Sequence, residues 1–267
     1  MNQNHIKTEA LDLIRSLNTS RITVIYDGIR IWEEIIRNIR IIEEENSHHI
    51  YDGRSTPIAA PFVQGDSFKN IQGLPDILYV NEDYVFGIEH FQFDASSNNR
   101  KGSSMKTEEF IIKEKINEKF KGVKHYNEKV YMNVDFSYDN YKKSLFKSFD
   151  HHADNIEKYR SVMSLLYPDR KILLGFFIED VTALGNFIRI SGEIQSLKLF
   201  QCRDFLDKLS AVQNLDYIIT KNKILYPTDI QISQITKDSM QILKKNSLHI
   251  DSNNYYKYKY GKSYSSG

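Results

Sequence analysis

Two carboxylates, Asp76 and Glu89, occupy positions from which metal-assisted chemistry could be carried out. Asp76 precedes the apolar run 77–80, and Glu89 lies inside the next apolar run, 84–93, beyond the polar turn 81–83. A tight turn can bring an acid at the start of one strand and an acid within the next strand to the same edge of a sheet. Two carboxylates suit Mg²⁺ or Mn²⁺ and leave positions for water and a phosphate oxygen. The pair therefore predicts a metal site of the kind that hydrolyses phosphodiester bonds.

The residues around these two acids resemble a known motif. Gly73-Leu74-Pro75-Asp76, followed by Gly87-Ile88-Glu89 with twelve residues between the two acids, is similar to the first two-thirds of the PD-(D/E)XK nuclease motif. The resemblance is close only over residues 73–94. It implies a restriction-endonuclease-like core, in which a helix precedes the hairpin that carries the motif and a later helix and strand complete the sheet. It also implies a divalent-metal-dependent nuclease acting on DNA, in a setting such as restriction or phage defence.

The third part of the motif departs from the family's pattern. The family places a lysine two residues after the second acid, where it helps to position the attacking water, and this chain has Phe91 there. Three explanations stay open: Gln92 replaces the lysine through a β-bulge, Lys101 or another lysine enters from the following loop, or activity has been lost. An inactive scaffold would bind nucleic acid or a protein partner. A coincidental motif in an unrelated α/β protein is the remaining alternative, so the sequence leaves open whether the chain is an enzyme.

Relatives of this fold often add an acid from the preceding helix to the metal site. Continuing the apolar stripe of region 21–45 by one helical step leads to Glu43, and Glu33 lies at the edge of the stripe. The resemblance therefore makes Glu43 a candidate third ligand, with Glu33 as an alternative. Both side chains could instead be solvated or paired with Arg37 and Arg40.

Other kinds of site find little support in the sequence. The pairs His48-His49 and His151-His152 are adjacent, and neighbouring side chains on a helix or strand cannot both face one ion, so we expect no zinc site. His90 is either a proton carrier beside Glu89 or a histidine bonded into the core. No GxxxxGK[ST] or GxGxxG pattern accompanies a strand-to-helix turn, and no serine has the context of a nucleophile elbow.

The two acids need a sheet to position them, and the hydrophobic pattern predicts one. Between Arg21 and Glu45 apolar residues recur at helical spacing, which predicts a long central helix. Prolines and glycines predict an irregular connection over 46–69, and serines with a glycine predict a loop over 95–105. The remaining expected elements are helices at 107–121, 149–166 and 199–213 and strands at 75–80, 84–93, 171–179, 215–220 and 223–226. Alternating strands and helices favour a mixed central β-sheet flanked by helices.

The bulk composition points to a globular protein of a reducing compartment. Among 267 residues, 36 lysines and arginines balance 35 acids, so the net charge of +1 creates no global field toward nucleic acid. The single cysteine, Cys202, cannot form an intramolecular disulfide. No stretch approaches the ~20 apolar residues of a membrane span, so we expect a cytoplasmic protein without membrane contact. Residues 1–251 are expected to form a single α/β domain.

The C-terminal residues differ in character from the rest of the chain. Residues 252–267 alternate tyrosine with lysine and lack apolar side chains for a core, so we expect them to be disordered. Lysines can neutralise phosphates and tyrosines can stack on unpaired bases, which makes this tail and Arg100-Lys101 candidate DNA contacts. A merely flexible end is the simpler interpretation of the tail. A homodimer would suit a DNA-cutting protein, although no sequence pattern indicates one.

Overall fold

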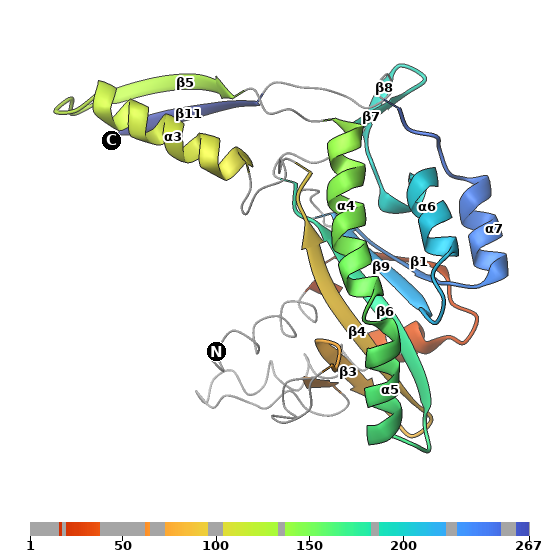
Figure 1. Ribbon diagram of the computed structural model, residues 1–267. Coiled ribbons are helices and arrows are strands. Elements are labelled where there is room, and N and C mark those ends of the chain that lie inside the picture. The colour runs from red at the N-terminus through yellow and green to blue at the C-terminus, as the bar shows by residue number, and fades with distance from the viewer. Residues whose placement is uncertain are drawn as a thin grey trace.

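The computed structural model describes residues 16–17, 20–37, 62–64, 73–95, 104–132, 137–182, 187–222, 229–251 and 260–266. The main body is a seven-stranded mixed sheet with the strand order β1-β10-β9-β6-β4-β3-β2 (Figure 1). These strands are β1 (Arg21–Tyr26), β2 (Phe62–Gln64), β3 (Ile77–Val80), β4 (Tyr84–Phe93), β6 (Lys171–Asp180), β9 (Tyr217–Asn222) and β10 (Asp229–Gln234). The prediction of a mixed α/β sheet flanked by helices is confirmed at this level.

Strands β4, β6 and β9 form the parallel centre of the sheet. The last eight residues of β6 are all buried, which is the burial expected of a strand covered on both faces and explains its nearly unbroken apolar sequence. On one side β3 pairs with β4 as an antiparallel hairpin. On the other side β10 runs antiparallel to β9, and β1 runs parallel to β10. The hairpin that carries the two acids is therefore held against the most buried strand.

Helices cover both faces of this sheet. One hydrophobic core joins the sheet to α4 (Tyr138–Ala153), α5 (Ile156–Leu166), α6 (Arg203–Ser210) and α7 (Lys237–Lys245). A second core covers the other face, where Trp32 from the helical residues 31–37 packs edge-on against Phe86 and Tyr217. Within the described ranges, no helix has the length and apolar character needed to cross a membrane.

The prediction of one long helix over residues 21–45 is wrong. Its first part is the strand β1, whose central residues 22–25 are β-branched and pair in parallel with β10. A turn at residues 28–29 follows, and Asp27 Oδ2 accepts a hydrogen bond from the backbone N–H of Trp32 at 2.9 Å. This bond satisfies one of the amides at the start of a helix that have no partner within the helix. The helix therefore begins after β1, at residue 31.

Elsewhere the predicted and observed elements differ mainly in their ends. The strand predicted at 84–93 is β4 itself. The helix predicted at 149–166 is two helices, α4 and α5, which meet at the turn Asp154–Asn155. Over 199–213, the 3₁₀ helix η3 (Leu199–Gln201) precedes α6. Several observed elements have no predicted counterpart: helix α7 and the strands β2, β5 (Tyr126–Met132), β7 (Phe187–Ile190), β8 (Glu193–Ser196) and β10. The strand predicted at 223–226 lies outside the described residues.

Two smaller sheets lie outside the main one. The strands β7 (Phe187–Ile190) and β8 (Glu193–Ser196) form a hairpin. A second unit consists of α3 (Ser104–Lys119), β5 (Tyr126–Met132) and β11 (Tyr260–Ser266), and Figure 1 shows it projecting from the main body. β11 pairs antiparallel with β5 along its whole length. The expectation of disorder over 252–267 is therefore wrong for its last part, because a backbone ladder to β5 supplies the order that apolar side chains do not.

Candidate functional site

Asp76 and Glu89 occupy corresponding positions on the two arms of the β3–β4 hairpin. The register runs from Val80 opposite Val85 to Ile77 opposite Ile88, so the preceding residue, Asp76, is level with Glu89. Residues directly opposite each other in such a pair have their Cβ atoms about 5 Å apart. The Asp76 Oδ2 atom also accepts a hydrogen bond from the backbone N–H of His90 at 2.8 Å, which holds this carboxylate beside β4. The hairpin thus brings the two acids to neighbouring positions.

Helices α4 and α5 cover Glu89, which is only 7% exposed. Its Oε1 accepts a hydrogen bond from the Tyr159 hydroxyl at 2.8 Å and lies 2.8 Å from Nδ1 of His152. Burial raises the pKa of Tyr159, and the charge and hydrogen bonding of Glu89 and the charge of Asp76 raise it further. One phenol of α5 therefore lies in the field of both carboxylates, which ties the two acids to a single partly buried site.

An aromatic ring stands at the position of the motif lysine. Phe91 stacks on the imidazole of His152, with 4.4 Å between the ring centroids and 6° between the ring planes. Phe91 and Glu89 share one face of β4, so His152 contacts both of them. The nitrogen group that approaches Glu89 here is thus an imidazole from α4, where the family's pattern has an ammonium group from the same strand.

The pair of carboxylates suits a hard divalent cation that keeps several water ligands, and not an ion held entirely by protein side chains. The described residues contain no group of three or more His, Cys, Asp and Glu side chains that could hold a metal ion. Mg²⁺ is commonly held by one or two carboxylates, with water completing its octahedral shell. Asp76 and Glu89 offer such a pair, and the His90 amide and the Tyr159 hydroxyl orient their oxygens. These two residues are the ones that could hold the ion.

Gln92 does not join this site. β4 pairs with β6 in unbroken register from Tyr84 to Phe93, so the bulge that would turn Gln92 toward Glu89 is not present in β4. The Gln92 side chain instead donates a hydrogen bond to Glu179 Oε2 at 2.7 Å, on the other face of the sheet. Lys101 and Glu43, the other predicted contributors, lie outside the described residues.

The acids of the helical residues 31–37 serve another part of the hairpin. Glu33 is exposed. Glu34 accepts hydrogen bonds from three side chains of the hairpin and its turn, which are Tyr79, Asn81 and Tyr84. Burial alone would raise the pKa of Glu34, but these hydrogen bonds and a nearby arginine lower it. This carboxylate therefore anchors the helix to the turn end of the hairpin.

A polar cluster that the sequence did not indicate lies on the sheet face opposite Glu89. We call His90, Gln92, Glu179 and Lys221 the Glu179 cluster. Strands β4, β6 and β9 carry its members Gln92, Glu179 and Lys221 in register. Lys221 Nζ lies 2.7 Å from Glu179 Oε1, and His90 Nε2 lies 3.1 Å from Glu179 Oε2. Both carboxylate oxygens are thus engaged by the protein, which gives the cluster a role in joining three strands.

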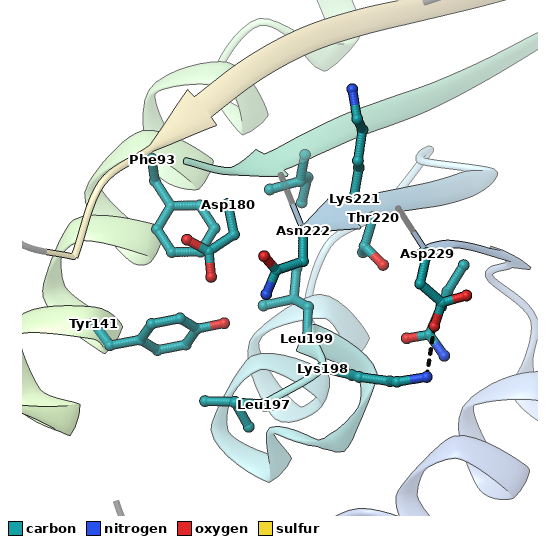
Figure 2. A pocket seen from close by; sticks show the side chains of 12 residues that line it. Phe93, Tyr141, Asp180, Leu197, Lys198, Leu199, Thr220, Lys221, Asn222 and Asp229 are labelled. Atoms are coloured by element: carbon teal, nitrogen blue, oxygen red, sulfur yellow. Dashed lines mark hydrogen bonds and ion pairs between the residues drawn. The ribbon is translucent and has the colours of Figure 1, made fainter. Parts of the chain in front are cut away.

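The cavity at the carboxyl ends of β6 and β9 is too small to receive a substrate. Its volume of about 20 Å³ is enough for roughly one water molecule. Figure 2 shows Asp180, Thr220 and Asn222 around it, together with an ion pair in which Lys198 Nζ lies 2.6 Å from Asp229 Oδ2. Neither Asp76 nor Glu89 lines this cavity, so the cavity and the carboxylate pair are separate features of the sheet.

Comparison with known proteins adds no relative from which a function could be transferred. No family model, no curated protein and no solved structure matches this chain. The function must therefore be inferred from the chemistry of the site.

Proposed function

We propose that this protein is a divalent-metal-dependent nuclease that hydrolyses phosphodiester bonds of DNA, with Asp76 and Glu89 as the metal ligands. The observation that carries the proposal is the pairing of these carboxylates on the β3–β4 hairpin beside one buried phenol. A restriction-endonuclease-like core is part of the proposal. Its support is the order of elements, in which a helix precedes the hairpin and helices lead from the hairpin to β6, a strand parallel to β4. A cytoplasmic role in restriction or phage defence would suit such an activity.

Each residue of the site has a distinct part in this proposal. Bound between the carboxylates, Mg²⁺ or Mn²⁺ would supply an activated water and stabilise charge on the phosphate. The amide of His90 orients Asp76, and the Tyr159 hydroxyl orients Glu89. Such partners fix the direction of ligand lone pairs, and their loss commonly weakens metal binding by about 10- to 100-fold. The stacked Phe91–His152 pair packs beside Glu89 on the side of α4.

A second candidate function is that of a non-catalytic scaffold that binds nucleic acid or a protein partner. Phe91 favours it, because a phenyl ring packed on His152 cannot position a water as a lysine would. This alternative keeps the same hairpin and the same acids. It differs from the nuclease in a measurable way, since DNA would be retained without being cut.

The test measures Mg²⁺ and Mn²⁺ binding by calorimetry and plasmid cleavage on the same samples. We expect Asp76→Asn and Glu89→Gln to abolish detectable binding and to lower the cleavage rate at least about 100-fold, because each removes a negative ligand. Glu82→Gln is the matched control, since Glu82 is an exposed acid of the same hairpin and should behave as wild type. Circular dichroism checks that the variants fold.

The possible outcomes separate the two functions. Metal binding and cleavage by the wild type, with loss of both in the two site variants, would support the nuclease. Metal or DNA binding without cleavage would favour the scaffold. A wild type that binds neither ion, or site variants that cleave as fast as Glu82→Gln, would overturn the assignment of Asp76 and Glu89 as ligands.

A further inference from the structure

Helix α3 presents an apolar surface that the rest of the described chain leaves exposed. Phe110 is 65% exposed and Ile111 is 47% exposed, and Val123, just beyond the helix, is 49% exposed. The opposite side of the helix faces inward, because Ile116 is buried. Phe110 and Ile111 are neighbours on the helix, and large apolar side chains exposed side by side mark an interaction surface more often than scattered single residues do.

The charges on this surface indicate what kind of partner it fits. Phe110 and Ile111 form one end of a shallow groove on α3, and the other lining residues are Glu114, Lys115, Asn117, Glu118 and Lys121. Two acids and two lysines give the groove no net charge, so it has no electrostatic preference for a polyanion such as DNA. Acids and lysines that alternate along one helix are instead complementary to the same helix running in the opposite direction.

We propose that this face of α3 binds the same face of a second copy of the chain in an antiparallel, two-fold symmetric dimer. With the axis at Asn117, Lys115 of one copy lies within one residue, about 1.5 Å along the helix, of the level of Glu118 of the other. Glu114 and Lys121 meet in the same way, and symmetry repeats each pair. The axis also places Phe110 of one copy beside the turn that follows α3 in the other copy, where Val123 is exposed. Apolar burial drives the association, and the ion pairs set its direction.

The arrangement of the elements leaves room for such a contact. Figure 1 shows the unit of α3, β5 and β11 projecting from the main sheet, with α3 apart from α4 and α5. A parallel arrangement of the two helices about the same face would bring Glu114 against Glu114 and Lys115 against Lys115, which is repulsive. The dimer does not depend on the metal site, so it stands or falls independently of the nuclease proposal.

Sedimentation equilibrium of the full chain over about 1–100 μM is the first test, a range suited to a dissociation constant in the micromolar region. We expect the wild type to shift from 31.3 kDa toward twice that mass, and Phe110→Glu to remain a monomer at every concentration. Leu165→Glu is the matched control, because Leu165 is 81% exposed on α5 and its change should leave the mass unaltered.

A charge exchange distinguishes the proposed pairing from a general loss of helix. Lys115→Glu should raise the dimer dissociation constant about tenfold or more, because it sets acid against acid twice across the axis. Adding Glu118→Lys to the same chain should restore the wild-type constant. A wild type that stays monomeric, a Phe110→Glu variant that dimerises normally, or a double variant no better than the single one would overturn the proposal. Loss of DNA retention by Phe110→Glu at unchanged mass would assign the face to nucleic acid and overturn it as well.

Discussion

Glu179 shows how one buried carboxylate can join three strands of the sheet. It is 6% exposed, and its partners Gln92, His90 and Lys221 come from the strands on both sides of β6. A buried charge of this kind is costly unless every oxygen finds a partner. Burial alone would raise the pKa of Glu179, but the hydrogen bonds and charges of His90 and Lys221 lower it to about 2.

This lowered pKa predicts how stability depends on pH. The ionised carboxylate stabilises the fold above its unfolded pKa of 4.5, and the contribution disappears as pH falls toward about 2. A pKa lowered this far corresponds to a contribution on the order of a few kcal/mol. The free energy of unfolding, measured with urea at a series of pH values, should therefore fall more steeply in acid for the wild type than for Glu179→Gln. Parallel curves for the two proteins between pH 6 and pH 3 would contradict this account, and Glu82→Gln should follow the wild type.

Residues that act together here come from distant parts of the chain, which limits what their spacing can predict. Asp76 and Glu89 could be found from the sequence because a short turn connects their strands, so local geometry sets their relation. His152 and Tyr159 reach Glu89 only because α4 and α5 fold back over β4. The sequence makes Gln92 a candidate only if β4 contains a bulge, and the regular alternation along β4 places its side chain on the other face.

Strand β4 is the element on which both polar sites depend, and Gly87 lets α5 approach it closely. A Cβ atom at Gly87 would lie 2.6 Å from Pro75 Cγ and 2.7 Å from Met163 Sδ. Pro75 precedes Asp76, and Met163 lies one helical turn beyond Tyr159 on α5. The absent side chain at this position therefore sets the distance between the hairpin and the helix that carries the phenol.

Gly87→Ala should destabilise the protein by about 1–3 kcal/mol, because the added methyl group has no room and must displace Pro75 or α5. The thermal midpoint should fall, and the metal affinity expected of Asp76 and Glu89 should fall with it. Gly28→Ala is the control, since its nearest neighbour is the flexible end of Gln234 at 3.1 Å. A thermal midpoint for Gly87→Ala that is no lower than that for Gly28→Ala would contradict this expectation.

Elements were predictable where local pattern and tertiary environment agree. The continuous apolar runs of β4 and β6 predict buried strands, and both are buried strands at the centre of the sheet. In the segment that became β1, isoleucines recur at helical spacing, yet their β-branched side chains also suit a strand and β10 supplies a partner. β10 lies next to the edge strand and its residues alternate between buried and partly exposed. Its sequence therefore lacks the continuous apolar run that marks β4 and β6 as strands.

The molecule as a whole consists of a main body built around the large sheet and a projecting unit. The strands β5 and β11 of this unit flank, in the sequence, most of the main body. In the sequence β5 comes before α4, and β11 comes after the last strand and helix of the main body, yet the two strands pair with each other. The expected division into a folded region 1–251 and a disordered tail does not describe this arrangement. A two-stranded ladder has little independent stability, so the unit depends on both strands being present.

Deleting residues 252–267 should therefore loosen the projecting unit without unfolding the main body. Hydrogen exchange followed by mass spectrometry should show β5 amides exchanging at nearly unprotected rates, because their partners in β11 are gone. Amides of β6, which pair with β4 and β9, should keep their protection and serve as the internal reference. Equal protection of β5 in the full and shortened chains would show that β11 does not stabilise it.

The pairing of β1 with β10 has a consequence for the time course of biosynthesis. Arg21 lies opposite Asp229, so the partner of the first strand is made 208 residues later (229 minus 21). At typical translation rates this interval lasts about 10–40 s. Throughout that time β1 must wait on the ribosome with its apolar and backbone groups unpaired, and closing so long a loop makes edge completion a late step of folding. β1 therefore remains an open strand edge, available for aggregation or chaperone capture, until β10 has been made.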